Sequence, residues 1–457
     1  MKTVVEPLEG NKVKLSVEVD ELEFESALDA TFRRIAREVR IPGFRPGKAP
    51  RRLLEARMGT EAARQEALRD ALPDYYAKAL KETDVDAIAP PEIDITGGQE
   101  AGPVSFDAVV QIRPQLHLAG YTGLQVTVPS PEVTPAEIDA QIDRLRNNFG
   151  ELRPVERAAR DADHLTVDIK GTRGGEAVAG MTTDDFLYEL GSGTVLPELD
   201  EQLRGAKVGD ILSFDAELPG GEGPVSLRVL VKDVKEKILP EVTDEWAAEA
   251  SEFDTVEELR ADLTKRIGLV KRVQSQLALR NATISALVQL VAEDAPEPLV
   301  DAEVERQAHD LHHRLEAQGA TIPQYLQAIG QSEQTLLAEM RQGAEESVKA
   351  ELALRAVAEA EDIEATDEEV DAEIARLAER MDQKPEQLRR QLERAEQMAA
   401  VRSDVRKSKA LEWLVEQVVA VDEEGHSIDR SLLSPEPEGD APDATSGAES
   451  KESVSQP

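Results

Sequence analysis

The chain has 457 residues, a formal net charge of -39 and no cysteine. At roughly 150 residues per domain, this length predicts about three domains. The absence of cysteine excludes disulfides, thiolate catalysis and cysteine-ligated metal sites. The excess of negative charge favours solubility and disfavours general binding to nucleic acid.

The N-terminus carries no pattern typical of a targeting segment. It begins MKTVVEPLEG, with an acid already at Glu6 and no apolar run of about 7–15 residues behind it, so we expect no secretory signal. No stretch approaches the roughly 18 apolar residues of a membrane span. We therefore expect a cytoplasmic protein that does not contact a membrane.

Residues 1–112 show the mixed periodicity of an α+β domain. Apolar residues alternate with polar ones over 11–19 and again over 104–112, as in half-buried strands, and a further strand is expected at 92–96. Apolar residues at helical spacing predict two helices, one from Asp20 to the stop at Pro42 and one over 61–81.

The next two segments are expected to be a connector and a β-rich domain. Residues 113–154 are rich in Pro and Gly and contain Thr134-Pro135-Ala136-Glu137, a capping box with Pro at the first helical position. Residues 155–240 change to short alternating strands with Gly-rich turns. Three strands are expected, at Leu165–Ile169, Ile211–Leu218 and Ser226–Val234.

Residues 241–432 are almost purely helical in pattern, and we expect an extended all-α domain with arms. The stretch 256–292 contains no Pro and would be roughly 55 Å long as one helix, more than a compact domain needs. The tail 433–457 is acidic, poor in hydrophobic residues and predicted to be disordered. The predicted fold class is thus multidomain α+β.

A locally basic segment interrupts the acidic chain. Between Arg33 and Arg57, nine Lys and Arg residues stand against two Glu residues. The loop within it has glycines that open the backbone, prolines that stiffen it, an aromatic that could insert into a groove, and cations for phosphate or carboxylate. The alternative interpretation is that these basic residues form an ordinary solvated surface without a binding partner. The predicted binding residues are Gly43, Phe44, Arg45, Pro46, Gly47 and Lys48.

A phosphate-binding P-loop is excluded at this position. That motif requires Gly where Pro42 stands and Ser or Thr where Ala49 stands. No other segment offers a glycine-rich nucleotide loop, so we expect neither a nucleotide site nor a cofactor.

The motif Gly43–Pro50, placed after an amphipathic helix, resembles the signature of the trigger factor family. The order of the predicted domains resembles that family over nearly the whole chain. The resemblance implies docking at the ribosomal exit tunnel, against ribosomal protein and rRNA. It further implies a middle domain of FKBP type, a peptidyl-prolyl isomerase, and a helical domain that shields nascent polypeptides without ATP.

The resemblance also implies an isomerase pocket. FKBP-type catalysis lowers the roughly 18–20 kcal/mol barrier of X-Pro rotation through a dry pocket, without an acid or a base. Ile169 and Leu199 stand where the family has aromatic residues, so the lining is mostly aliphatic and we expect weak activity. A β domain without activity remains the alternative. The predicted lining residues are Ile169, Phe186, Val195, Leu196 and Leu199.

His309, His312 and His313 lie at helical spacing beside Asp310. Two of them could meet a metal on one helix face, but no further ligand pattern supports this. The sequence therefore favours a surface cluster and no metal site. For the whole chain two other functions stay open: mainly a prolyl isomerase, or an rRNA-binding assembly factor.

Overall fold

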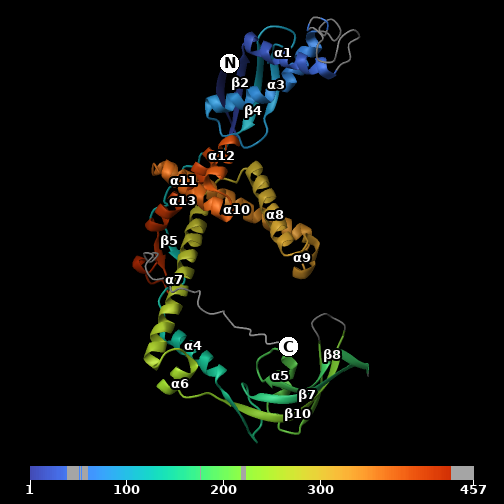
Figure 1. Ribbon diagram of the computed structural model, residues 1–457, viewed down its shortest axis with the longest axis vertical. Coiled ribbons are helices and arrows are strands. Elements are labelled where there is room, and N and C mark those ends of the chain that lie inside the picture. The colour runs from blue at the N-terminus through green and yellow to red at the C-terminus, as the bar shows by residue number, and fades with distance from the viewer. Residues whose placement is uncertain (39–50, 52, 54–59, 175, 218–222, 434–457) are drawn as a thin grey trace, which may run out of the picture. The chain divides into compact units, whose positions relative to one another are not determined.

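The computed structural model describes residues 1–38, 51, 53, 60–174, 176–217 and 223–433 (Figure 1). The predicted binding loop, Gly43–Lys48, lies outside these residues, as does the tail from 434. The chain divides into two units, one formed by 1–128 with 278–427 and the other by 129–277 with the segment from 428. The predicted fold class is confirmed: α+β at the N-terminus, β-rich in the middle and helical towards the C-terminus.

The first unit opens with an antiparallel sheet in the order β1-β2-β4-β3. The three predicted strands are confirmed, and β1 is an additional edge strand that the sequence did not reveal. Its residues are almost all exposed, so they carry no alternation of buried side chains. The strands are β1 Lys2–Leu8, β2 Lys12–Val19, β3 Glu92–Gly97 and β4 Val104–Gln111.

Helices α1 (Glu21–Glu38) and α3 (Thr60–Thr83) cover one face of this sheet (Figure 1). Phe24, Leu68 and Phe106 from these elements are fully buried together. On the other face the alternation places polar groups, since Lys14 lies 2.8 Å from Asp107 across β2 and β4.

The helical part of the first unit packs through small and aliphatic side chains. Ala353 and Val357 of α10 are completely buried. The segment after the N-terminal sheet returns to this part: β5 (Gln125–Thr127) pairs in parallel with β11 (Val419–Val421). The helices are α8 Glu297–Ala317, α9 Ile322–Ile329, α10 Glu333–Ala360, α11 Asp367–Arg380, α12 Pro385–Arg394 and α13 Met398–Gln417. The short η1 (Arg430–Leu432) is assigned to the second unit.

The second unit contains an antiparallel sheet in the order β6-β10-β7-β8, with β9 also paired to β10. The expected strands correspond to β7, β9 and β10. Strands β6 and β8 were not predicted, and the sheet begins inside the segment expected as connector. The elements are β6 Glu151–Pro154, β7 His164–Arg173, β8 Glu176–Glu189, α5 Pro197–Leu203, β9 Ile211–Ala216 and β10 Val225–Ile238.

Three helices complete this unit: α4 (Pro135–Asn148), α6 (Asp244–Ala250) and the start of α7 (Val256–Val288). The capping box at Thr134 is confirmed by its two reciprocal hydrogen bonds with Glu137. Lys271 donates to the same carboxylate at 2.8 Å, and these bonds lower the pKa of Glu137 to about 2. Within the described part of the chain, no helix is both long and apolar enough to cross a membrane.

Candidate functional site

The basic segment is partly neutralised by acids of its own domain. Arg51 donates to Glu25 at 2.5 Å and to Asp29 at 2.6 Å, and its guanidinium lies 4.9 Å from the ring centroid of Phe32. Arg34 likewise donates to acids of α3 at 2.6 and 3.0 Å. Two of the nine cations counted in the sequence are therefore paired within their own domain. Phe44, Arg45 and Lys48 belong to the loop that the structure does not describe.

The predicted isomerase lining lies around β7, β8 and α5. Ile169, Leu196 and Leu199 are buried in one core cluster, and Val195 packs partly exposed against it. Phe186, on β8, is 36% exposed, and its ring centroid lies 6.2 Å from that of buried Tyr188. Of the five predicted lining residues, the structure thus buries three aliphatic ones, packs Val195 against them and leaves the aromatic Phe186 accessible at the edge.

A buried acid, which the sequence did not single out, holds the turn that leads into this lining. Asp200 accepts hydrogen bonds from the Tyr188 hydroxyl at 2.7 Å, from Gly191 N at 2.7 Å and from Gly193 N at 3.1 Å. Both glycines have positive φ, 89° and 62°, which suits glycine in a tight turn. A sequence pattern could have indicated this turn: Gly191-x-Gly193 is followed by an acid, Asp200, in the first turn of the helix that begins at Pro197.

The Tyr188 hydroxyl stays protonated and therefore always donates its hydrogen bond to Asp200. Burial and the hydrogen bond to Asp200 raise the pKa of Tyr188 to about 12. The phenol therefore stays protonated across the physiological range. The three donors fix the position of α5, and with it Val195, Leu196 and Leu199.

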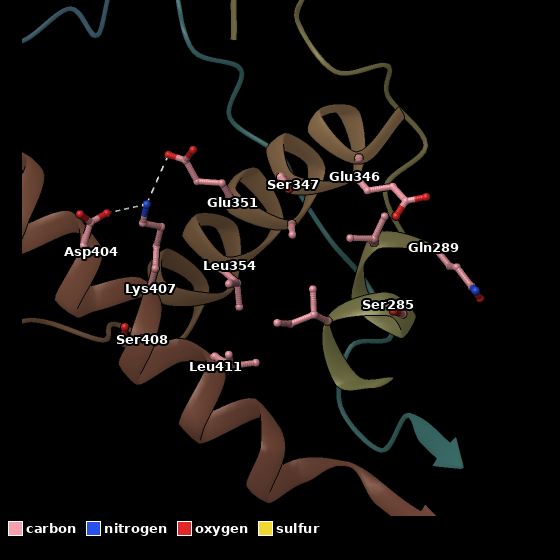
Figure 2. Close-up of a pocket in the computed structure, with 14 residues that line it drawn as sticks. Ser285, Gln289, Glu346, Ser347, Glu351, Leu354, Asp404, Lys407, Ser408 and Leu411 are labelled. Atoms are coloured by element: carbon pink, nitrogen blue, oxygen red, sulfur yellow. Dashed lines mark ion pairs between the residues drawn. The ribbon is translucent and has the colours of Figure 1, made fainter. Parts of the chain in front are cut away.

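The helical part contains a groove of about 810 Å³ between α7, α10 and α13. Its apolar lining comes from all three helices, with Ile284 and Val288 from α7, Leu354 from α10 and Leu411 from α13. Figure 2 shows the labelled leucines projecting into the space between the helices. Gly343 and Ala350, seven residues apart on α10, also line it and leave room because their side chains are small.

The charged groups at this groove are mostly paired with one another. Lys407 lies 2.7 Å from Asp404 and 3.5 Å from Glu351 (Figure 2). Arg355 donates to Glu351 at 3.1 Å. The groove therefore offers an apolar floor with a rim on which three acids, Glu346, Glu351 and Asp404, stand against one lysine, which suits an apolar segment of polypeptide more than a small anion.

A second apolar surface lies on α7 in the other unit. Leu269, Val270, Val273 and Leu277 fall on one helix face and are between 47% and 59% exposed. Large exposed apolar patches of this kind mark surfaces that bind other molecules. Sequence alone could not separate these residues from core positions, because Leu and Val are typical of both.

The fold and these surfaces describe a class: a multidomain protein that binds polypeptide and carries an FKBP-like β domain. Family models match along the chain, "Bacterial trigger factor protein" over residues 1–145 and its C-terminal model over 255–416. The model "FKBP-type peptidyl-prolyl cis-trans isomerase" matches 155–219.

Curated relatives cover almost the full length. The trigger factor of Rhodococcus opacus is 38% identical over 449 residues, 98% of this chain and 97% of that protein. The trigger factor of Saccharopolyspora erythraea is 35% identical, over 95% of this chain and 93% of the other. A solved structure of a trigger factor chaperone, at 22% identity, shares the fold with a TM-score of 0.50 and covers 91% of this chain and 100% of its own.

The chain belongs to the trigger factor family. It is accordingly a ribosome-associated chaperone whose middle domain is of the FKBP-type peptidyl-prolyl isomerase class.

Proposed function

We propose that the groove between α7, α10 and α13 holds apolar segments of nascent chains. The observation that carries this proposal is the apolar floor contributed by three helices around a volume of about 810 Å³. Apolar contact binds weakly and without sequence specificity, which suits a chaperone that must release its clients. The net charge of -39 would keep the loaded complex soluble.

The residues Gly43–Lys48 would dock this chaperone at the exit tunnel, against ribosomal protein and rRNA. The support is the basic loop within a chain whose other surfaces repel nucleic acid. The division of labour would be docking by 1–112, isomerisation by 155–240 and client binding by 241–432. Client binding and release would follow mass action in the cytoplasm, without a nucleotide.

If the groove holds clients, Gly343→Glu should weaken the binding of clients, because Gly343 lines the groove. A Cβ added at Gly343 meets no atom within 4 Å, so a side chain at this position begins in open space. The carboxylate would then lie against the apolar floor, and a loss of about 1 kcal/mol of contact weakens affinity roughly fivefold. The measurement is suppression of aggregation of a denatured client by the full chain.

Gly343→Ala is the matched control. It leaves the groove open, and replacing Gly by Ala within α10 stabilises the helix by up to about 1 kcal/mol. Client holding by this variant should match that of the wild type. Equal suppression of client aggregation by the Glu and Ala variants would contradict the proposal that clients bind in the groove.

The middle domain should be a slow isomerase that depends on Phe186. This ring is the accessible aromatic of the lining, while Ile169 and Leu199 are aliphatic and buried. Phe186→Ala should lower kcat/KM on an X-Pro peptide about tenfold, which corresponds to ~1.4 kcal/mol. Leu187→Ala, on the opposite face of β8, is the control and should keep the rate. A fast wild-type rate that survives Phe186→Ala would contradict this proposal.

A further inference from the structure

Three of the six histidines of the chain, His309, His312 and His313, lie in one five-residue stretch of α8. His309 and His313, one helical turn apart, bring their Nε2 atoms to 3.0 Å. Their ring centroids are 4.3 Å apart, and the rings are nearly perpendicular at 87°. All three side chains are exposed, and none belongs to the groove or to the isomerase lining.

This separation of the two nitrogens suits chelation of a metal ion. With metal–nitrogen bonds of about 2.0–2.1 Å, two nitrogens 3.0 Å apart subtend roughly 95° at the metal. That angle matches neighbouring ligands in the square-planar or octahedral geometry of Cu²⁺ and Ni²⁺. Tetrahedral Zn²⁺ requires a slightly wider angle, which histidines at the same helical spacing also supply in zinc sites.

A carboxylate on the same helix orients one of the two rings. One oxygen of Glu316 lies 3.4 Å from Nδ1 of His313, which favours the tautomer with its proton on Nδ1 and makes Nε2 the acceptor of the hydrogen bond from Nε2 of His309. A metal ion would replace this hydrogen bond, with His309 in the tautomer that carries its proton on Nδ1. The other oxygen lies 3.4 Å from Nε2 of His312, so that ring faces the carboxylate. Asp310, the acid between the histidines, is already paired with Arg306 at 2.8 Å.

We propose that His309 and His313 form a two-imidazole chelate for Cu²⁺ or Ni²⁺ on the exposed face of α8. Among the residues that the structure describes, no group of three or more His, Asp or Glu side chains is placed to hold one ion. The chelate is therefore bidentate, with water in the remaining positions, and the ion is exchangeable. His312 lies beside the site and is not a ligand.

The test is a calorimetric titration of the untagged full chain with CuCl₂ or NiCl₂, which gives the number of sites and the affinity. One site per chain is expected. His309→Gln and His313→Gln should each weaken it at least about tenfold, because one imidazole cannot chelate. Two controls should bind as the wild type does: His312→Gln, from the same cluster, and His426→Gln, an exposed histidine elsewhere that is also flanked by acids.

Circular dichroism is the measurement that checks whether these exposed substitutions leave the helix content unchanged. Three results would overturn the proposal: no binding of either ion by the wild type, wild-type affinity in His309→Gln or His313→Gln, or a loss in His312→Gln as large as theirs.

Discussion

Replacing Phe44, Arg45 and Lys48 together by alanine is expected to abolish co-sedimentation of the full chain with ribosomes. Hydrogen bonds to charged groups contribute about 1.5–3 kcal/mol each. Losing two of them removes about 3 kcal/mol, which corresponds to roughly a hundredfold in affinity. The apolar contact of Phe44 adds to this loss. The two cations should also contribute about two to the slope of log affinity against log salt concentration.

The matched control changes two cations and one exposed apolar residue elsewhere. Arg376, Arg380 and Met381 are suitable, since both arginine side chains are about 70% exposed, at 72% and 69%, and Met381 is 54% exposed. Their replacement by alanine alters net charge equally but should leave co-sedimentation intact. Unchanged binding by the loop variant would refute docking through Gly43–Lys48. Equal losses in both variants would indicate a general charge effect.

Asp200→Ala is expected to unfold the β domain locally or entirely. The substitution leaves the Tyr188 hydroxyl and the Gly191 and Gly193 amides without their acceptor. The unsatisfied buried donor of Tyr188 costs about 1–3 kcal/mol, and the bonds lost at the exposed residues Gly191 and Gly193 cost about 1 kcal/mol each. The total of about 3–5 kcal/mol is a large share of the stability of one domain. Hydrogen exchange over residues 188–203 of the full chain should accelerate strongly.

Two further variants separate this cluster from general damage to α5. Glu201 is the exposed neighbour of Asp200, and Glu201→Ala should have little effect. Tyr188→Phe removes one donor together with its bond and should cost about 1 kcal/mol. If exchange in Asp200→Ala is as slow as in Glu201→Ala, the carboxylate does not hold the turn.

The two predictions address different parts of one function. The first tests the proposed docking on the ribosome, while the second tests whether Asp200 holds the turn beside the proposed isomerase lining. If the groove holds clients as proposed, both variants should still bind them, because Asp200 lies in the other unit from the groove. Aggregation suppression off the ribosome should therefore survive the loop variant.

The sequence by itself determined the order of the segments and most of their secondary structure. Alternation placed β2 and β4, because each buries one face against α1 and α3. Proline, glycine and capping residues placed helix ends such as Thr134, because those signals act within one turn. The motif Gly43–Lys48 is also local, and together with the order of the predicted domains it indicated the family.

The tertiary structure decided everything that depends on residues far apart in the chain. The exposed edge strand β1 carries no alternation, so only its pairing with β2 reveals it. The hydrogen bonds to Asp200 and the groove between α7, α10 and α13 each join residues that are separated in the sequence, which local patterns cannot bring together. The spacing of His309 and His313 allowed a shared face, but the 3.0 Å between their Nε2 atoms depends on side-chain rotamers. Burial likewise separated the exposed apolar face of α7 from core positions, because the same residue types serve both purposes.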